Sequence, residues 1–425
     1  MYNRKVKSKN EKVKSKKVKG QGLNIIIVSQ CFKPTRNGVV DSIDTNRTEL
    51  EKMGHRVFVF APRSHDKDFR ETDDRVFRLP SFVALFSRKD YPIIVPWAKL
   101  DWQMLGNFQP DIVHTQHIFT AGRLAQKISR TLGIPLVATY HTLIADYAQQ
   151  WLPVFGRQLK KGIIWRSRQF CNSADRIVAP STALKDVLIS YGVTKPITVI
   201  PTGIYLEKYH RLDPRPLKAK FNIPDSRKLI LFVGRLAIEK NVDLLVETFR
   251  RLAEKDAHCH LILVGAGPAE NQLKQKISGC GLSSRVTFTG MVPKEEAIKF
   301  FASCDIFAFP SVTETQGIVV AEAMAGGSVP VAMAKMGPLD VIKDEKNGLL
   351  VNYDQPTGKV IDDFCQQIDR LLKDRELSDR LRQQALVDIK EFSASNCAEK
   401  MERLYVDTIN NQSAGFPTKI PVHKS

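Results

Sequence analysis

Residues 228–267 read KLILFVGRLAIEKNVDLLVETFRRLAEKDAHCHLILVGAG, and this stretch decides the fold. It begins with an apolar run (228–236), continues with an amphipathic, charge-rich segment (241–255) and ends with a second apolar run (260–267). Continuous apolar runs of this length are typical of strands that are buried on both faces of a parallel sheet. The stretch therefore predicts a strand–helix–strand unit of a doubly wound α/β sheet.

The same alternation occurs on both sides of this stretch. The preceding runs predicted as strands are 23–32, 55–62, 111–116, 135–141, 176–181 and 197–203, and helical segments such as 42–54 and TAGRLAQKISRTLG separate most of them. RVTFTG, DIFAFPS and VPVAMA continue the series afterwards. The polar, proline-punctuated segment 204–227 is predicted to be a linker between two Rossmann-like halves. Ligands of such sheets bind at the carboxyl ends of the strands.

The length of 425 residues is sufficient for two or three domains. We expect a final long helix over about 375–410 and a disordered segment from residue 410 onward. The predicted boundaries are a basic disordered tail at 1–20, an N-terminal Rossmann-like domain at 21–205, a C-terminal Rossmann-like domain at 206–390, and a closing helix with a disordered tail at 391–425.

The formal net charge is +19, and residues 1–20 contribute nine Lys or Arg against one Glu. This tail is either a solvated disordered segment or one attracted to anionic lipid or nucleic acid. It lacks the apolar core of a secretory signal, and no run of about 18 apolar residues predicts a transmembrane helix. The seven scattered cysteines favour a reducing cytoplasm over a structural zinc site. His258, Cys259 and His260 lead into a strand, where side chains alternate, so metal binding is not expected there.

Two acids mark the stretch 313–331, TETQGIVVAEAMAGGSVPV. Glu314 and Glu322 would not converge on one continuous helix, but a turn at Gly317 followed by a helix would allow it. The start of that helix, at about Gly317–Val319, offers backbone N–H groups to phosphate, and carboxylates accept hydrogen bonds from hydroxyls. A ligand with both groups is a nucleotide sugar. The alternative is a surface loop with two solvated glutamates, although Glu322 stands within an apolar run.

Arg235 and Lys240 follow the strand at 228–236 within VGRLAIEKN. A guanidinium can hold two phosphate oxygens and an ammonium acts as a point charge, so the pair suits a diphosphate.

Arg235 and Lys240 in GRLxxEKN, followed by the E-x7-E pair, resemble the retaining glycosyltransferases of the GT-B fold, family four, over roughly residues 22–405. The resemblance implies an α/β enzyme with two Rossmann-like, doubly wound parallel-sheet domains facing across a cleft. It implies that the C-terminal domain binds a nucleotide-sugar donor and the N-terminal domain an acceptor. It also implies a hexosyltransferase that makes an α-glycoside. A front-face route fits, because no further carboxylate is an obvious nucleophile.

Site residues follow from the same resemblance. Glu314 would contact the hexose hydroxyls, Glu322 the ribose, and His141 the hexose near the reacting carbon. The implied catalytic residues are His141, Glu314, Arg235 and Lys240; the implied donor-binding residues are Gly38, Arg235, Lys240, Gly265, Gly267, Met291, Gln316, Gly317, Ile318, Val319 and Glu322. His114 and His117 are expected on the acceptor side. Because Arg235 and Lys240 would neutralise the diphosphate, neither a metal ion nor a cofactor is expected.

Three other interpretations share some of these features. GAGPAE (265–270) follows a strand, but Glu270 replaces the third glycine of a dinucleotide fingerprint. A nucleic-acid-binding protein would interleave aromatic residues with its basic residues, whereas the tail has only Tyr2, so no nucleic-acid partner is expected. A sugar-nucleotide epimerase would share the architecture but would need no acceptor.

The acceptor is indicated by NGVVDSI, TYHTLIADY and TETQG, which resemble the bacterial diacylglycerol glucosyltransferases, although Asp41 stands where that subgroup would have Thr. Residues 155–170 and 81–100 mix basic and apolar side chains, as expected of segments on an anionic membrane. We therefore expect a cytoplasmic enzyme, peripheral at the inner face of the cell membrane, that moves glucose from UDP-glucose to diacylglycerol. The alternative is transfer to a saccharide or lipid-linked saccharide in surface-polysaccharide assembly, and a GDP-sugar donor remains open.

Overall fold

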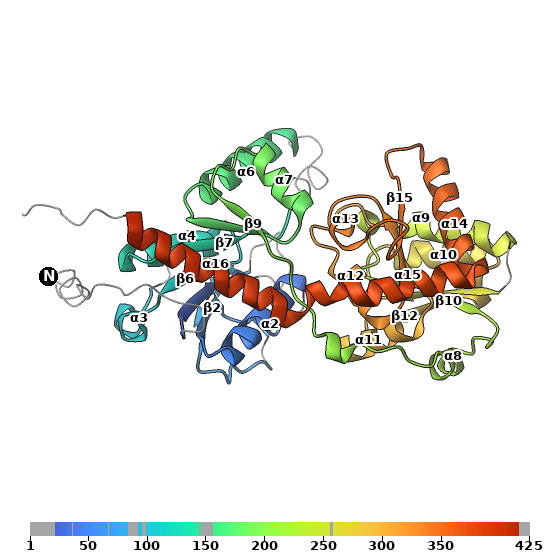
Figure 1. Ribbon diagram of the computed structural model, residues 1–425, viewed down its shortest axis with the longest axis horizontal. Helices are drawn as coiled ribbons and strands as arrows, with labels where there is room; N and C mark the ends of the chain where they lie inside the picture. Colours follow the sequence, from blue (N-terminus) through green and yellow to red (C-terminus); the bar gives the residue numbers. More distant parts are fainter. Residues whose placement is uncertain are drawn as a thin grey trace, which may run out of the picture. The chain divides into compact units, whose positions relative to one another are not determined.

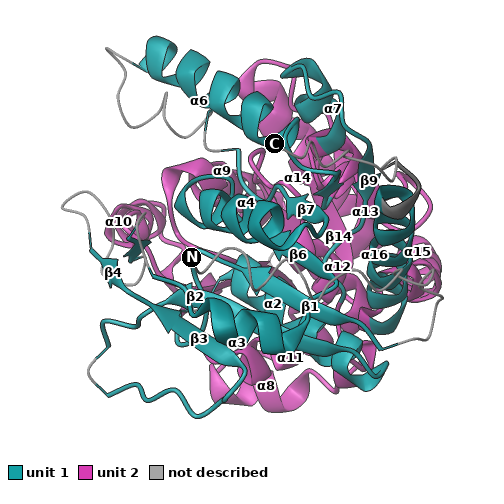
Figure 2. Ribbon diagram, turned by 90° about the vertical axis from the view of Figure 1, so that its left-hand side faces the viewer, with its two compact units in different colours: residues 1–180, 185–203, 395–425 teal, residues 181–184, 204–394 magenta. Residues whose placement is uncertain are grey.

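The chain forms two compact units, shown in teal and magenta in Figure 2. Unit 1 comprises residues 1–180, 185–203 and 395–425, and unit 2 comprises residues 181–184 and 204–394. The computed structural model describes residues 22–415 except 36, 67, 84–91, 96–98, 144, 146–155 and 256–257. The basic tail predicted at 1–20 and much of the segment 81–100 therefore lie outside the described residues.

Unit 1 is built on a seven-stranded parallel sheet in the order β3-β2-β1-β6-β7-β8-β9. Strands β2, β6, β7 and β9 of this sheet are labelled in Figure 1. Its strands are β1 (Asn24–Val28), β2 (Arg56–Pro62), β3 (Val76–Leu79), β6 (Ile112–Thr115), β7 (Leu136–Thr139), β8 (Arg176–Ala179) and β9 (Ile197–Val199). The sequence predicted six of these strands. It missed β3, an edge strand whose run VFRL is short and interrupted by Arg78.

Helices cover this sheet, and a short antiparallel pair, β4 (Ser81–Phe82) and β5 (Ile93–Ile94), lies beside it. The helices are α2 (Gly38–Lys52), α3 (Trp102–Phe108), α4 (Thr120–Leu132), α6 (Gly156–Cys171), α7 (Thr182–Ser190) and α16 (Ala394–Gly415). One buried cluster joins apolar residues of β1, β2 and β6 to residues of α2 and α16. The last helix of the chain is therefore part of the N-terminal core.

Unit 2 is built on a six-stranded parallel sheet in the order β12-β11-β10-β13-β14-β15. Its strands are β10 (Lys228–Val233), β11 (Cys259–Val264), β12 (Val286–Gly290), β13 (Ile306–Phe309), β14 (Val329–Met333) and β15 (Leu349–Val351). Its helices are η1 (Leu206–Lys208), α8 (Arg215–Lys220), η2 (Ile238–Lys240), α9 (Val242–Lys255), α10 (Glu270–Gly279), η3 (Ser283–Arg285), α11 (Lys294–Ser303), α12 (Ile318–Gly326), α13 (Pro338–Val341), α14 (Thr357–Lys373), α15 (Arg375–Asp388) and η4 (Ile389–Phe392). The two Rossmann-like parallel sheets expected from the sequence are thus confirmed.

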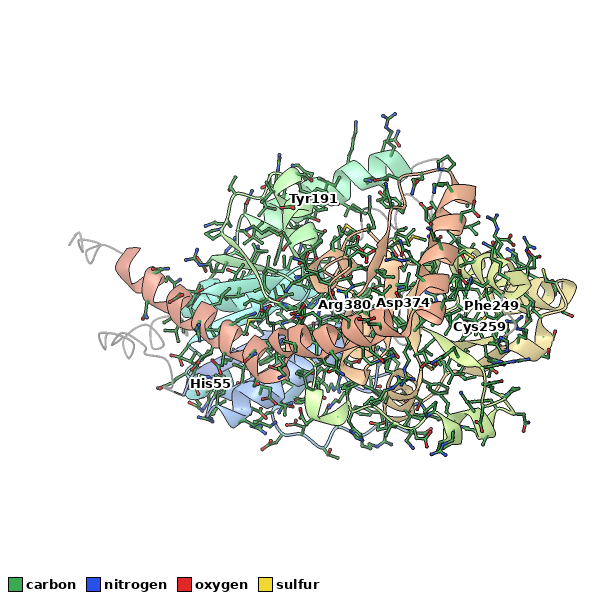
Figure 3. All side chains as sticks on the ribbon, turned by 45° about the vertical axis from the view of Figure 1, so that its right-hand side comes forward. His55, Tyr191, Phe249, Cys259, Asp374 and Arg380 are labelled. Carbon is green, nitrogen blue, oxygen red and sulfur yellow. The ribbon has the colours of Figure 1, made fainter. Side chains whose placement is uncertain are left out.

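The strand–helix–strand unit at 228–267 is β10-α9-β11, as predicted. Phe249 of α9 and Cys259 of β11 belong to the buried core of unit 2 and are labelled in Figure 3. The guanidinium of Arg285 lies over the Phe249 ring, 5.6 Å from its centroid, and donates to the carbonyl oxygen of Cys259. This packing joins η3 and α9 to β11, which pairs with β10, the strand that leads into the predicted diphosphate loop.

The predicted linker and final helix need correction. The segment 204–227 is not a free linker, because it contains η1 and α8 and belongs to unit 2. The helix expected over 375–410 is two helices, since the backbone is extended at Ser393, between η4 and α16. There the N–H of Ile204 donates to Phe392 and the N–H of Ala394 donates to Ile204, so strand-like contacts interrupt the helix.

The closing helix and disordered tail predicted at 391–425 also differ from the prediction. Residues 395–415 lie in unit 1, and 410–415 are the last turns of α16 rather than a disordered segment. The physical reason is burial: Met401, Leu404, Tyr405 and Ile409 pack into the apolar cluster on the unit 1 sheet. This packing outweighs the polar composition of residues 410–415.

Candidate active site

The two charged motifs of unit 2 meet beyond the carboxyl ends of β10 and β13. Lys240 ends η2, the short helix after β10, and Glu314 lies between β13 and α12. The Lys240 Nζ forms a salt bridge with Glu314 Oε1, and each side chain is only about one fifth exposed. Arg235 lies in the same loop as Lys240, and its guanidinium is 3.7 Å from the Glu239 carboxylate. The structure thus brings together residues that are 74 positions apart in the sequence.

Helix α12 begins next to this salt bridge. Its N-cap is Gly317, which has a φ of 73°, a left-handed conformation that favours glycine. The carbonyl oxygen of Glu314 accepts a 2.8 Å hydrogen bond from the N–H of Gly337, which fixes the loop ahead of the helix. The first N–H groups of a helix have no acceptor within it, so those of Ile318 and Val319 can receive an anion. The predicted loop-to-helix transition is confirmed.

Glu322 lies in the second turn of α12 and is only 8% exposed. The hydroxyl of Tyr209, also buried, donates a 3.0 Å hydrogen bond to Glu322 Oε1, and the Lys294 ammonium lies 3.8 Å from the same oxygen. The solvated-glutamate alternative is therefore wrong for this residue. A buried carboxylate held by a phenol and an ammonium is a fixed acceptor for hydroxyl groups.

Gly265 and Gly267 occupy positions where the backbone leaves no room for a side chain. Gly265 has a φ of 128°, and a Cβ atom there would lie 2.0 Å from the carbonyl oxygen of Gly234. A Cβ atom on Gly267 would lie 2.2 Å from the carbonyl oxygen of Leu236. Both contacts are with the strand end and loop that precede Lys240.

Met291, which follows β12, is 80% exposed.

Gly265→Ala is therefore predicted to destabilise unit 2, because it combines backbone strain with a steric clash. We expect a loss of roughly 2–4 kcal/mol in the free energy of unfolding, measured by urea titration. Gly279→Ala is the matched control: a Cβ atom there meets nothing within 4 Å, and Gly279 ends helix α10. Equal stability of the two variants would contradict the argument.

Gly38 is placed differently from the prediction. It is the first residue of α2 rather than part of a loop, because the Asn37 side chain caps the helix by accepting hydrogen bonds from Val39 N and Val40 N, both at 2.9 Å. A Cβ atom on Gly38 would meet nothing within 4 Å. The packing of unit 1 therefore does not itself require glycine at this position.

His141 follows β7 and is half-buried. Its Nε2 lies 2.7 Å from Gln116 Oε1, and an amide oxygen can only accept, so Nε2 carries the proton. Burial, together with the charges that His117 and His114 would carry, lowers the pKa of His141 to about 3. The ring is therefore neutral at neutral pH, with its proton on Nε2.

The two histidines expected on the acceptor side have different environments. His117 is half-buried, its Nδ1 accepts a 3.1 Å hydrogen bond from Gln30 N, and burial lowers its pKa to about 4. His114 is 1% exposed, and both of its ring nitrogens are hydrogen-bonded to Tyr405 and Thr139. A ring without accessible surface cannot contact an acceptor. The acceptor assignment is therefore withdrawn for His114.

Comparison with known proteins identifies the family. The family model described as "Glycosyl transferases group 1" matches residues 214–387, and the model described as "Glycosyltransferase Family 4" matches residues 36–208. The alpha-monoglucosyldiacylglycerol synthase of Streptococcus pneumoniae is 30% identical over 400 residues, covering 91% of this chain and 86% of the relative. The chain belongs to the group 1 glycosyltransferases.

Two further comparisons agree with this assignment. A GDP-mannose-dependent alpha-mannosyltransferase of Mycobacterium tuberculosis is 31% identical over 336 residues, covering 78% of this chain and 84% of the relative. The solved structure of sucrose-phosphate synthase from Thermosynechococcus elongatus has a TM-score of 0.72 at 20% identity, covering 90% of this chain and 98% of that chain. The GT-B fold expected from the sequence is thereby established for this glycosyltransferase.

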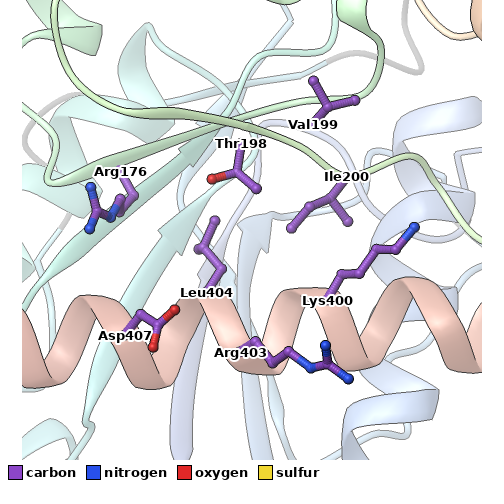
Figure 4. A pocket seen from close by; sticks show the side chains of 8 residues that line it. All are labelled: Arg176, Thr198, Val199, Ile200, Lys400, Arg403, Leu404 and Asp407. Carbon is purple, nitrogen blue, oxygen red and sulfur yellow. The ribbon is translucent and has the colours of Figure 1, made fainter.

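Other features of the glycosyltransferase lie away from these residues. A surface pocket of about 310 Å³ lies between the sheet edge formed by β8 and β9 and helix α16 (Figure 4), and contains no predicted site residue. Within the described ranges, no group of three or more His, Cys, Asp or Glu side chains could hold a metal ion. No helix among the described residues is both long and apolar enough to cross a membrane.

Sequence reasoning missed three residues that support the site: Tyr209, Lys294 and Gln116. Tyr209 lies in the segment interpreted as a linker, and Lys294 begins a helix for which no role was proposed. The sequence around Tyr209 or Lys294 contains no motif that indicates a role in the site, because only the fold brings these residues close to Glu322. Gln116 did have one, since it precedes His117 in the run HTQH and lies two positions after His114 in a predicted strand.

Proposed function

We propose that this glycosyltransferase moves glucose from UDP-glucose to diacylglycerol at an anionic membrane surface, with retention of the anomeric configuration. The observation that carries the proposal is the Lys240–Glu314 salt bridge beside the N-terminus of α12. It joins a cation suited to a diphosphate with a carboxylate suited to hexose hydroxyls. The name of the pneumococcal relative, alpha-monoglucosyldiacylglycerol synthase, supports the choice of sugar and acceptor.

In this proposal, the bond between the sugar and the diphosphate breaks while negative charge grows on the leaving oxygen. Arg235, Lys240 and the N–H groups at the start of α12 would stabilise that charge without a metal ion. Glu322, held by Tyr209 and Lys294, would accept hydrogen bonds from the ribose hydroxyls. Binding the two ends of the donor separately would leave its reacting centre between them.

Retention, which the resemblance to the family implies, would proceed by a front-face route, because the assigned acids leave no spare nucleophile. Glu314 and Glu322 are both committed to hydroxyl groups in this proposal, so a double displacement has no obvious carboxylate. The departing diphosphate would instead deprotonate the acceptor hydroxyl on the same face of the sugar. His141, neutral and half-buried, would contact the hexose near the reacting carbon.

The test is transfer from UDP-glucose in vesicles that contain diacylglycerol and an anionic phospholipid. Glu314→Gln keeps the shape of the side chain but removes its charge, so we expect kcat/KM to fall roughly 10- to 150-fold, the equivalent of one charged hydrogen bond. Glu254→Gln is the control: its carboxylate is paired with Arg250 on the exposed side of α9, and the variant should match the wild type.

Other substrates separate the alternatives. Transfer from UDP-glucose to a soluble saccharide without vesicles would favour surface-polysaccharide assembly over lipid glycosylation. Transfer from GDP-mannose and not from UDP-glucose would identify GDP-mannose as the donor, as in the name of the mycobacterial relative. Wild-type rates in Glu314→Gln would contradict the proposed site itself.

Membrane attachment is proposed for helix α6 of unit 1. Its inner side buries Ser167, Phe170 and Cys171, whereas its outer side exposes Trp165 (53% exposed) among basic residues. The exposed basic residues of the helix are Arg157, Lys161 and Arg168. A tryptophan surrounded by cations is suited to the interface of an anionic bilayer, where each cation contributes about 1 kcal/mol.

We therefore predict that Trp165→Ala and Lys161→Glu each weaken binding to phosphatidylglycerol vesicles in a sedimentation assay. The Lys161→Glu effect should diminish in high salt, because screening weakens charge attraction, whereas the Trp165→Ala effect should persist. Lys255→Glu, an equal charge change at the exposed end of α9 in unit 2, should bind like the wild type. Unchanged binding of both α6 variants would refute a role for this helix.

A further inference from the structure

The candidate catalytic residue His141 lies at one end of a row of polar side chains on one face of the unit 1 sheet. Strands β6 and β7 pair in parallel, with His114 opposite Val137. Side chains alternate along a strand, so Gln116 shares the face of His114 and Thr139 shares the face of Val137. His141 lies two residues after Thr139, so the same alternation places its side chain on this face.

Helix α16 covers this face. Ile112 and Val137 belong to the same buried cluster as Tyr405 of α16. Tyr405 is 1% exposed, and its ring meets the His114 ring edge-on, with centroids 5.6 Å apart. The polar row is therefore enclosed between the sheet and the last helix of the chain.

Hydrogen bonds link the row from end to end. Tyr405 Oη lies 2.6 Å from His114 Nδ1, and Thr139 Oγ1 lies 2.7 Å from His114 Nε2. Gln116 Nε2 lies 3.4 Å from the same His114 Nε2, and Gln116 Oε1 lies 2.7 Å from His141 Nε2. All four supporting side chains are buried.

The chemistry of Gln116 determines the proton positions along the row. Its amide oxygen can only accept, so His141 donates from Nε2, and its amide nitrogen can only donate, so His114 accepts at Nε2. Burial lowers the pKa of His114 to about 3, so the ring is neutral and its one proton is on Nδ1, directed to Tyr405. Each ring therefore has one tautomer that satisfies all of these contacts.

We infer that Gln116, His114 and Tyr405 form a positioning relay through which helix α16 holds His141 in one tautomer and one ring orientation. In the proposed function His141 touches the substrate, and the other three residues, with Thr139, act through it. A buried polar row of this kind costs stability unless every member is paired, and pairing fixes its geometry. A reacting group held in one orientation speeds transfer, because the transition state then requires no reordering.

The inference rests on the proposed transferase activity of His141, and its test separates the two. Gln116→Met removes the link to His141 while keeping side-chain length, and Tyr405→Phe removes one hydroxyl while keeping the ring. We expect kcat for transfer from UDP-glucose to fall about tenfold or more in Gln116→Met and several-fold in Tyr405→Phe, with KM for UDP-glucose changed less than about twofold.

The double variant is the decisive arm. If the hydroxyl of Tyr405 acts through Gln116, then Tyr405→Phe has no further effect on kcat once Gln116 is Met. Multiplicative losses in the double variant, or a wild-type kcat in Tyr405→Phe, would overturn the relay. Tyr191→Phe is the control, since it removes a half-buried phenol of unit 1 outside this row and should leave kcat unchanged.

Nitrogen-15 NMR of the histidine rings in the full-length protein supplies a readout independent of activity. The relay predicts a single Nε2–H tautomer for His141 in the wild type, a mixture of tautomers in Tyr405→Phe, and the wild-type spectrum in Tyr191→Phe. A wild-type His141 signal of the Nδ1–H tautomer would overturn the inference. Lack of transfer by a wild type that shows the Nε2–H tautomer would instead refute the proposed function and leave the proton assignment standing.

Discussion

The candidate donor site depends on one steric constraint, the close approach of backbones beyond the carboxyl ends of β10 and β11. A Cβ atom on Gly265 or Gly267 would lie 2.0 or 2.2 Å from a carbonyl oxygen of the facing segment. Only glycine permits this approach. It determines the path of the loop that carries Arg235 and Lys240, and so allows Lys240 to reach Glu314. The proposed donor site in unit 2 therefore depends on this backbone packing.

In unit 1, polar side chains are buried beneath helix α16, where each needs a hydrogen-bond partner. Helix α16 completes its apolar core, yet also buries the Tyr405 hydroxyl beside His114. The Tyr405 hydroxyl and the His114 ring are hydrogen-bonded to each other, and Gln116 extends this row of hydrogen bonds to His141. The last segment of the chain thus contributes both to the stability of unit 1 and to the environment of a proposed catalytic residue. Its packing into the unit 1 core is the reason that α16 belongs to the N-terminal unit although it follows unit 2 in the sequence.

Much of the fold could be predicted from the sequence, because parallel strands appear as apolar runs and β10-α9-β11 has both strands and an amphipathic helix. The turn at Gly317 and the burial of Glu322 were also predictable from glycine and the surrounding apolar residues. Tyr209 and Tyr405 were not, because each meets its partner through tertiary packing across 113 and 291 positions. The acceptor role expected of His114 failed for the same reason: a strand pattern cannot show which buried face a later helix covers.

In the proposed site, Glu314 and Glu322 hold different ends of one nucleotide sugar. Calorimetric titration of UDP-glucose and of UDP into Glu314→Gln and Glu322→Gln tests it most directly. We expect Glu322→Gln to weaken the binding of both ligands by about tenfold, through loss of a charged hydrogen bond to ribose, and Glu314→Gln to weaken the binding of UDP-glucose alone. Equal weakening of UDP binding by both variants, or wild-type affinity for UDP-glucose in either, would show that the two glutamates do not hold different ends of the donor.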